Sequence, residues 1–534
     1  MKKAEREGGT PMKRKSVALL LCVCMLFSCT ACQSKQDDIY SQAMEKVSSQ
    51  ENGESSGESS AASSQLEDTA SADPTETPFE VNTSLSGELL IKCFLHSSNP
   101  GKDTNMECLA NEFMERYPNV RVTVSYSFDG STDAEETAQA REAYYSQVRT
   151  ELVSGEADYL LFGPADELNF YELGESGVFL DLRPYWEDDP EVDQSEYFME
   201  VLDALSVEGK MLGVPLSFTM DGFFLDRRWM EKLGVDTEDL TAVNCLTLLD
   251  WYDQLKTDEK DLQVTYGAWT QELAVSQEKT AYLDLETLTA NFTDPGFVDL
   301  LSRTRELEES DQSMMQITRI ECQDVDILHA MLRCLATGED FPVKNLPDIQ
   351  VFLDSSHPAL AAYSGITPDT LGYVNQPLEY LAGPYVAADS KGRVAVQSVE
   401  DFFIPSSMDD PDLAWEFVKY CVSRRETIRL ANNQLYTLNI PLNKENYALL
   451  VDAINQGEGY LYRYGKMQGA AMNEYDSQAG LAKLEEFLSL PLINGKLYGL
   501  DVDEYLEEFY EQKLTTAEEC AQKIQGRAEI WLNE

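Results

Sequence analysis

Basic residues, histidines and familiar catalytic motifs are all scarce in this chain of 534 residues. Lys and Arg number 41 against 95 for Asp and Glu, so the formal net charge is −54. Proteins that bind nucleic acid need a basic face for the phosphate backbone, and this excess of acid excludes such a partner. The sequence also contains no G-x-S-x-G, P-loop, H-E-x-x-H or G-x-G-x-x-G motif. We therefore expect neither an enzyme of those classes nor a nucleotide cofactor.

Metal-ligand patterns are missing as well. The three histidines (His96, His329 and His357) show no metal-ligand spacing, so we expect no zinc or other metal site. Seven cysteines follow Cys32, an odd number at irregular spacing and without a C-x-x-C pair. Most of them are predicted to be small buried hydrophobic residues, not a disulfide framework. They are Cys93, Cys108, Cys245, Cys322, Cys334, Cys421 and Cys520.

A targeting segment occupies the N-terminus. The basic run Met12–Lys15 precedes an apolar run, Val17–Phe27, that is too short to span a bilayer as a helix. Small residues just before Cys32 resemble a bacterial lipobox, which predicts a signal peptide over residues 1–31 and lipidation of Cys32. Cys29 is an alternative lipidation site, and a simple cleaved secretory signal is an alternative to lipidation. A diacylated cysteine would anchor the protein on the extracytoplasmic face of the cell membrane.

Residues 32–85 form a predicted tether after this cysteine. The segment is dominated by Ser, Glu, Gln, Asp and Thr, as in GESSGESSAASSQ, and it has too few apolar residues to fold. A flexible chain of ~50 residues has a root-mean-square reach of roughly 40 Å. We therefore expect a disordered tether between the membrane and a folded body over residues 86–534.

The folded body begins with alternating strands and helices. A buried strand, an amphipathic helix, an alternating strand, a second helix and a third strand follow one another within about 80 residues, which is the pattern of a parallel α/β lobe. These expected elements cover residues 87–95, 104–117, 120–126, about 135–154, and 157–162.

Polar residues follow two of these strands. In open α/β sheets, ligands bind beyond the carboxyl ends of the strands. Here those ends continue into His96–Asn99 and Gly163–Asp166, which are small and polar. They are candidates for the rim of a ligand site, although ordinary turns would have the same composition.

The stretch Val207–Met230 contains two extended runs separated by Pro215, and glycines punctuate it where tight turns or close backbone approach are needed. Gly209, Gly213 and Gly222 are these glycines. Taken alone, the stretch fits either a hairpin within one domain or a segment that passes from one lobe into another. The polar strand ends before it favour the crossing.

Several motifs, in order, resemble those of family 1 extracellular solute-binding proteins of ABC transporters. Leu173–Leu182 is similar to that family's turn of glycine, apolar residue and Asp-Leu, and Gly209–Pro215 is similar to its "G-K-x-x-G-V-P". Later matches are Phe292–Leu307, Ser398–Glu416, Tyr436–Asn443 and the C-terminal helix over residues 514–534. Asp226-Arg227-Arg228 departs from the family's usual Tyr-Asn-Lys. The resemblance covers nearly all of residues 86–534 and is weakest over about 310–380.

Local helix-start signals agree with two of these matches, Ser398–Glu416 and the C-terminal helix. Asp410 is a suitable N-cap with Pro411 at the first helical position. Thr515-x-x-Glu518 or Thr516-x-x-Glu519 provides a capping box for the last helix. The sequence therefore predicts helices that begin at these two points.

The resemblance implies an α/β, periplasmic-binding-protein-like fold: two lobes joined by crossing hinge segments, with a ligand cleft between them. Lobe 1 is expected over about 86–215 and 345–395, and lobe 2 over about 220–340 and 396–534. The implied function is capture of an extracellular solute, an oligosaccharide, by a monomer that delivers it to the permease subunits of an ABC importer. The alternatives are a surface-anchored carbohydrate-active enzyme and a ligand-sensing lipoprotein that signals to a membrane sensor.

A sugar site needs a flat apolar face for the ring and a few carboxylates or amides for the hydroxyl groups. Trp269 follows a predicted strand in a loop, unlike Trp415 and Trp531, which lie on apolar helix faces. For every polar candidate, the alternative to a ligand contact is an ordinary solvated loop position. The predicted ligand-binding residues are Asn99, Asp166, Asp221, Trp269, Asp354 and Tyr385.

Overall fold

The computed structural model describes residues 81–96, 105–128, 134–163, 173–174, 176–258, 262–266, 270–284, 287–310, 359–375, 381–423, 439–458, 473–495 and 500–533. The chain divides into two units, one of residues 1–81 and 131–142 and one of residues 82–130 and 143–534. The second unit contains both hydrophobic cores and the large sheet discussed below, and α3 begins in the first unit.

The first strands form a parallel sheet, as the hydrophobic periodicity predicts. The elements are β1 (Gly87–His96), α2 (Asn105–Arg116), β2 (Val120–Phe128), α3 (Ala134–Ser154) and β3 (Leu160–Gly163). β1 lies between β2 and β3 and pairs with both in parallel. This order brings the carboxyl ends of β1 and β3 to the same edge of the sheet.

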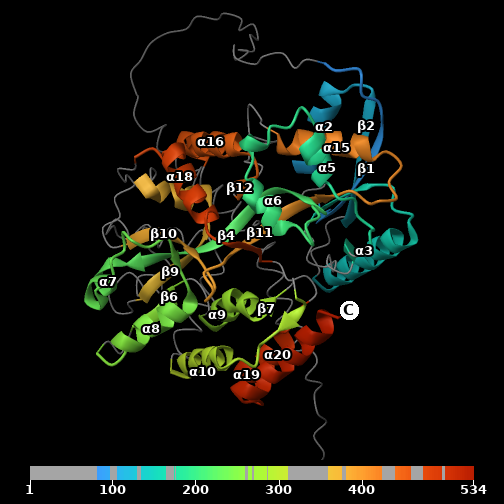
Figure 1. Cartoon of the computed structure of the whole chain (residues 1–534). Coiled ribbons are helices and arrows are strands. Elements are labelled where there is room, and N and C mark those ends of the chain that lie inside the picture. Colours follow the sequence, from blue (N-terminus) through green and yellow to red (C-terminus); the bar gives the residue numbers. More distant parts are fainter. Residues whose placement is uncertain are drawn as a thin grey trace, which may run out of the picture. The chain divides into compact units, whose positions relative to one another are not determined.

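A single long strand, β4 (Val214–Asp226), connects this sheet to the rest of the molecule. Its first half pairs antiparallel with β11 (Val394–Phe403) and β12 (Ile440–Pro441). Its second half pairs antiparallel with β9 (Ala359–Ile366) and β10 (Leu381–Ala387). The exchange of partners occurs between Thr219, opposite Gln397, and Gly222, opposite Val386 and Ser364. The crossing predicted for this stretch is therefore a continuous strand, visible near the centre of Figure 1.

The eleven-stranded sheet has the order β2-β1-β3-β11-β4-β10-β5, with the other strands joined to β4, β9 and β11. Its remaining strands are β5 (Ala242–Val243), β6 (Gln263–Tyr266) and β13 (Leu492–Asn494), and β7 (Leu283–Asp284) pairs separately with β8 (Thr289–Ala290). The α-helices and single turns between the strands are α5 (Arg183–Asp188), η1 (Gln194–Glu196), α6 (Met199–Leu205), α7 (Arg227–Leu233), α8 (Cys245–Leu255), α9 (Thr270–Glu278), η2 (Lys279–Tyr282), α10 (Pro295–Ser310), α14 (Pro368–Leu371) and η3 (Gly372–Asn375). The C-terminal part adds α15 (Pro411–Val422), α16 (Lys444–Ala453), η5 (Ile454–Glu458), α18 (Ser477–Leu488), α19 (Asp503–Tyr510) and α20 (Ala517–Trp531).

Both predicted helix starts are confirmed. The Asp410 carboxylate accepts a hydrogen bond from the backbone N–H of Leu413, and Pro411 is the first residue of α15. At α20, Thr516 and Glu519 form the reciprocal capping box. Each such cap satisfies backbone donors that an isolated helix end leaves without a partner.

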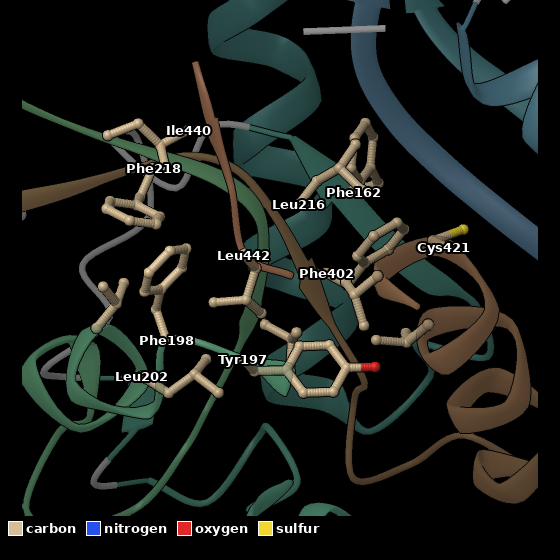
Figure 2. Close-up of a cluster of buried hydrophobic side chains, with 14 of the residues drawn as sticks. Phe162, Tyr197, Phe198, Leu202, Leu216, Phe218, Phe402, Cys421, Ile440 and Leu442 are labelled. Atoms are coloured by element: carbon tan, nitrogen blue, oxygen red, sulfur yellow. The ribbon is translucent and has the colours of Figure 1, made fainter. Parts of the chain in front are cut away.

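Two hydrophobic clusters lie along β4. The first gathers side chains of β1, α2, the start of β4, β11, α15, α16 and α18. Figure 2 shows part of it, where Phe218 of β4 lies beside Phe198 and Ile440, and Leu442 lies on the other side of Phe198. The second gathers the end of β4 with α8, α10, α19 and α20. A smaller cluster packs α3 against Phe179 and Phe403.

These clusters group the later segments differently from the predicted lobes. Residues 359–366 and 381–387 pair with the second half of β4 and place Leu360, Ala382 and Tyr385 in the second cluster. Hydrophobic residues within 394–422, 440–454 and 475–488 belong to the first cluster. β11, in the first of these segments, pairs with β3 and with the first half of β4. The C-terminal helices α19 and α20 lie in the second cluster, where lobe 2 was expected.

The five cysteines within the described residues form no disulfide, and Cys93, Cys245, Cys421 and Cys520 are buried in the cores. The prediction of small buried hydrophobic residues is thereby confirmed for these four. Among the described residues, no helix combines the length and apolar character needed to cross a bilayer.

Candidate functional site

Four of the predicted ligand-binding residues, Asn99, Asp166, Trp269 and Asp354, lie outside the described residues, as does Cys32. The strands that lead to the first two are described. β1 ends at His96 and β3 at Gly163, and the two strands are parallel neighbours. Their carboxyl ends therefore lie at one edge of the sheet, as the sequence predicts for a binding site.

Asp221 lies on β4 at the point where this strand changes partners. It is partly buried and opposite Gly365 of β9. Burial and the nearby charges of Glu278 and Asp221 raise the pKa of the Cys245 thiol. The Asp221 carboxyl is thus close enough to the start of α8 to act on this thiol. A partly exposed carboxyl at a strand crossing is well placed to accept hydrogen bonds from a ligand.

Tyr385 lies on β10 within the second hydrophobic cluster. Only 5% of its surface is exposed, and its hydroxyl donates a 2.8 Å hydrogen bond to the carbonyl oxygen of Thr237. Burial raises the pKa of this phenol. The side chain therefore joins β10 to the segment after α7, and its hydroxyl already has an acceptor.

Glu400 and Asp401 of β11 were not among the predicted site residues, and the structure places them at the carboxyl edge of the parallel strands. Asp401 is opposite Gly163, the last residue of β3, and Glu400 is opposite Ser217 of β4. Asp401 is buried and accepts a 2.7 Å hydrogen bond from the Ser398 hydroxyl. Glu400 is partly buried. Burial, and then the charge of Asp401, raise the pKa of Glu400 to about 7.

A cluster of polar side chains connects the turn between β10 and β11 to the end of α9 by hydrogen bonds. Asp389 is 2% exposed and accepts hydrogen bonds from the backbone N–H groups of Lys391 and Arg393 and, at 2.8 Å, from the Arg393 guanidinium. The buried Glu278 carboxylate accepts from the Ser390 N–H, while burial raises its pKa. This turn connects strands that contribute to different hydrophobic clusters, so the hydrogen bonds fix the direction in which the chain returns.

The described residues contain no group of three or more His, Cys, Asp and Glu side chains arranged to hold a metal ion. Burial also raises the pKa of the Cys93 and Cys245 thiols, which keeps them protonated and poorly nucleophilic. These two thiols are therefore not suited to nucleophilic attack.

Comparison with known proteins gives matches among solved structures only. No protein-family model matches the chain, and no curated protein is found to be related to it. The family 1 extracellular solute-binding protein of Alicyclobacillus acidocaldarius is similar over 85% of this chain and 100% of its own, with 11% identity and a TM-score of 0.48. The periplasmic oligogalacturonide-binding protein of Yersinia enterocolitica covers 84% and 99%, with 14% identity and a TM-score of 0.49. The ABC substrate-binding protein of Listeria monocytogenes in complex with cycloalternan covers 83% and 98%, with 15% identity and a TM-score of 0.45.

The likeness spans most of both chains in each case. At these identities and TM-scores, the description of the fold rests on this chain's own topology. That topology is mixed α/β, with a parallel sheet, a crossing strand and two principal hydrophobic clusters.

Proposed function

We propose that this protein is the substrate-binding component of an ABC importer, which captures an extracellular oligosaccharide and delivers it to a membrane permease. The observation that carries the proposal is the crossing of β4 between two hydrophobic clusters, with partly buried carboxyl groups beside it. Strands shared by two cores provide hinges, and closure about a hinge sequesters a ligand between the parts. The ordered sequence motifs described above support the choice of solute class.

The N-terminal sequence supports a matching location. A signal peptide over residues 1–31, lipidation at Cys32 and a flexible tether to residue 85 would hold the binding protein near its permease. Two acyl chains provide the stable membrane residence that a single chain does not. The protein would work as a monomer, since one binding body suffices to present the solute.

A thermal-shift screen of the protein without its signal peptide tests the function. We expect at least one neutral oligosaccharide to stabilise it by about 2.7 kcal/mol at 100 times the dissociation constant. Isothermal calorimetry with the same sugar should give one site per chain. Stabilisation by short peptides and by no sugar would overturn the carbohydrate class, and hydrolysis of the bound sugar would overturn the binding role.

Asp221 is the ligand-binding candidate within the described residues that is both partly exposed and at the crossing. We expect Asp221→Asn to weaken binding of that sugar roughly tenfold or more, because hydrogen bonds to charged groups contribute about 1.5–3 kcal/mol. Calorimetry would measure the change. Asp188→Asn, at an exposed position on α5, is the matched control and should bind as the wild type does. An equal loss in both variants would contradict a ligand contact at Asp221.

A further inference from the structure

Glu400 occupies an unusual position for a carboxyl group. β11 lies between β3 and β4 and runs antiparallel to both, so the register that sets Asp401 opposite Gly163 places Glu400 just beyond the last residue of β3. β1 ends at the same edge. Glu400 therefore stands where ligands bind in open α/β sheets, on a strand that also borders the crossing strand.

The neighbouring charge that acts on Glu400 is the negative charge of Asp401, and Glu400 forms no ion pair among the described residues. Asp401 follows it on the same strand. On β1, burial and then the charges of Glu400 and of Glu107, a residue of α2, raise the pKa of the Cys93 thiol. The residues opposite on the flanking strands, Gly163 and Ser217, are uncharged. An anionic ligand approaching this carboxyl would meet repulsion, whereas a hydroxyl group would find an acceptor.

We propose that Glu400 is a specificity-determining, ligand-contacting carboxyl, which accepts hydrogen bonds from the hydroxyl groups of a neutral solute and repels anionic solutes. This inference rests on the proposed solute-binding function and names the class of solute within it. Neutral oligosaccharides are selected and uronic-acid oligosaccharides are rejected, because the ionised carboxylate has acceptors only and no proton to share with a second carboxylate.

The proposal makes affinity depend on pH. A solute hydroxyl that donates to the carboxylate stabilises its ionised form, so binding lowers the pKa of Glu400 from its value of about 7 in the free protein. Binding then releases a proton, and affinity for a neutral solute rises between pH 6 and pH 8. We expect binding roughly three- to tenfold tighter at pH 8 than at pH 6, since a tenfold change in affinity corresponds to a pKa difference of about one.

Glu400→Gln is the informative substitution, because it keeps the shape of the side chain and removes its charge. The variant should fold. A carboxyl whose folded pKa is raised contributes stability only at low pH, and this contribution is lost as the pH rises through about 7. Glu400→Gln should therefore melt no lower than the wild type at pH 8. Glu88→Gln, at the exposed amino end of β1, is the matched control.

Calorimetry at pH 6 and pH 8 with maltotriose and xylotriose as neutral probes, and trigalacturonate as the anionic probe, tests the proposal. The wild type and Glu88→Gln should bind a neutral probe more tightly at pH 8. Glu400→Gln should lose this dependence, bind that probe about tenfold more weakly at pH 8, and bind trigalacturonate at least tenfold more tightly than the wild type does.

The possible failures are distinguishable. If the wild type binds a neutral probe equally at both pH values, or Glu400→Gln keeps the dependence, the role of Glu400 is overturned while the proposed function stands. Tight binding of trigalacturonate to the wild type also overturns it. If none of the probes binds any of the three proteins, the proposed function fails, and the inference fails with it.

Discussion

Replacing Phe218 by alanine should lower the free energy of unfolding by about 3–5 kcal/mol. The Phe218 side chain is fully buried on β4, and its ring meets that of Phe198 edge to face with centroids 5.5 Å apart. Ile440 of β12 is its register partner, and Figure 2 shows these side chains packed together. Truncation would leave a cavity beside β4. Because this strand is paired on both sides, it cannot move to fill the cavity. Urea unfolding should show a lower midpoint at an unchanged slope.

Leu514→Ala provides the control for this truncation. Leu514 is 68% exposed, so its removal should change the free energy of unfolding by no more than about 0.5 kcal/mol. If both variants lose the same amount, or if Phe218→Ala loses less than about 1 kcal/mol, the start of β4 is not a close-packed part of the core.

The start of the folded body, from β1 to β3, was predictable from sequence because its signals are local. Amphipathic spacing predicted α2 and alternation predicted β2. Because one helix separates β1 from β2 and another separates β2 from β3, a parallel sheet was the expected arrangement. Helix starts such as that at Asp410 depend on contacts between residues three apart, so the sequence specifies them directly.

The division of the later chain between cores was not predictable in this way. Strand partners far apart in sequence decide it: Asp401 is opposite Gly163, whereas Leu381 is opposite Asp226. Such pairings depend on register and packing between distant segments, which periodicity within a segment does not report.

Among the site residues, Asp221 was identified because it lies in a stretch whose glycines and proline mark it as unusual. Glu400 was missed because the chain has 95 acidic residues, and one carboxyl within a strand has no distinguishing local pattern. Only the register of β11 against β3 and β4 shows that Glu400 lies at the carboxyl edge of the sheet. Tyr385 was selected because it lies near a predicted return strand, and the pairing of that strand, β10, with β4 buries the ring.

A substitution at Gly222, the glycine of β4 that was predicted to allow close backbone approach, should also lower the free energy of unfolding strongly. A Cβ at Gly222 would lie 2.3 Å from the Ile366 Cδ1 atom and 2.9 Å from the carbonyl oxygen of Tyr385. Because Gly222 pairs with β9 on one side and β10 on the other, its backbone cannot move away from either neighbour. Gly222→Val should therefore lower the free energy of unfolding by about 3 kcal/mol, measured by urea unfolding.

Gly526→Ala tests whether this loss comes from crowding and not from the removal of a glycine as such. Gly526 lies within α20, and a Cβ there would meet no atom within 4 Å. Alanine is favoured over glycine inside helices, so this variant should be about 0.5–1 kcal/mol more stable than the wild type. Opposite signs for the two glycine substitutions would locate the constraint at the partner exchange of β4. A Gly222→Val protein as stable as the wild type would instead mean that β9 and β10 separate easily there, and the crossing could not act as a defined hinge.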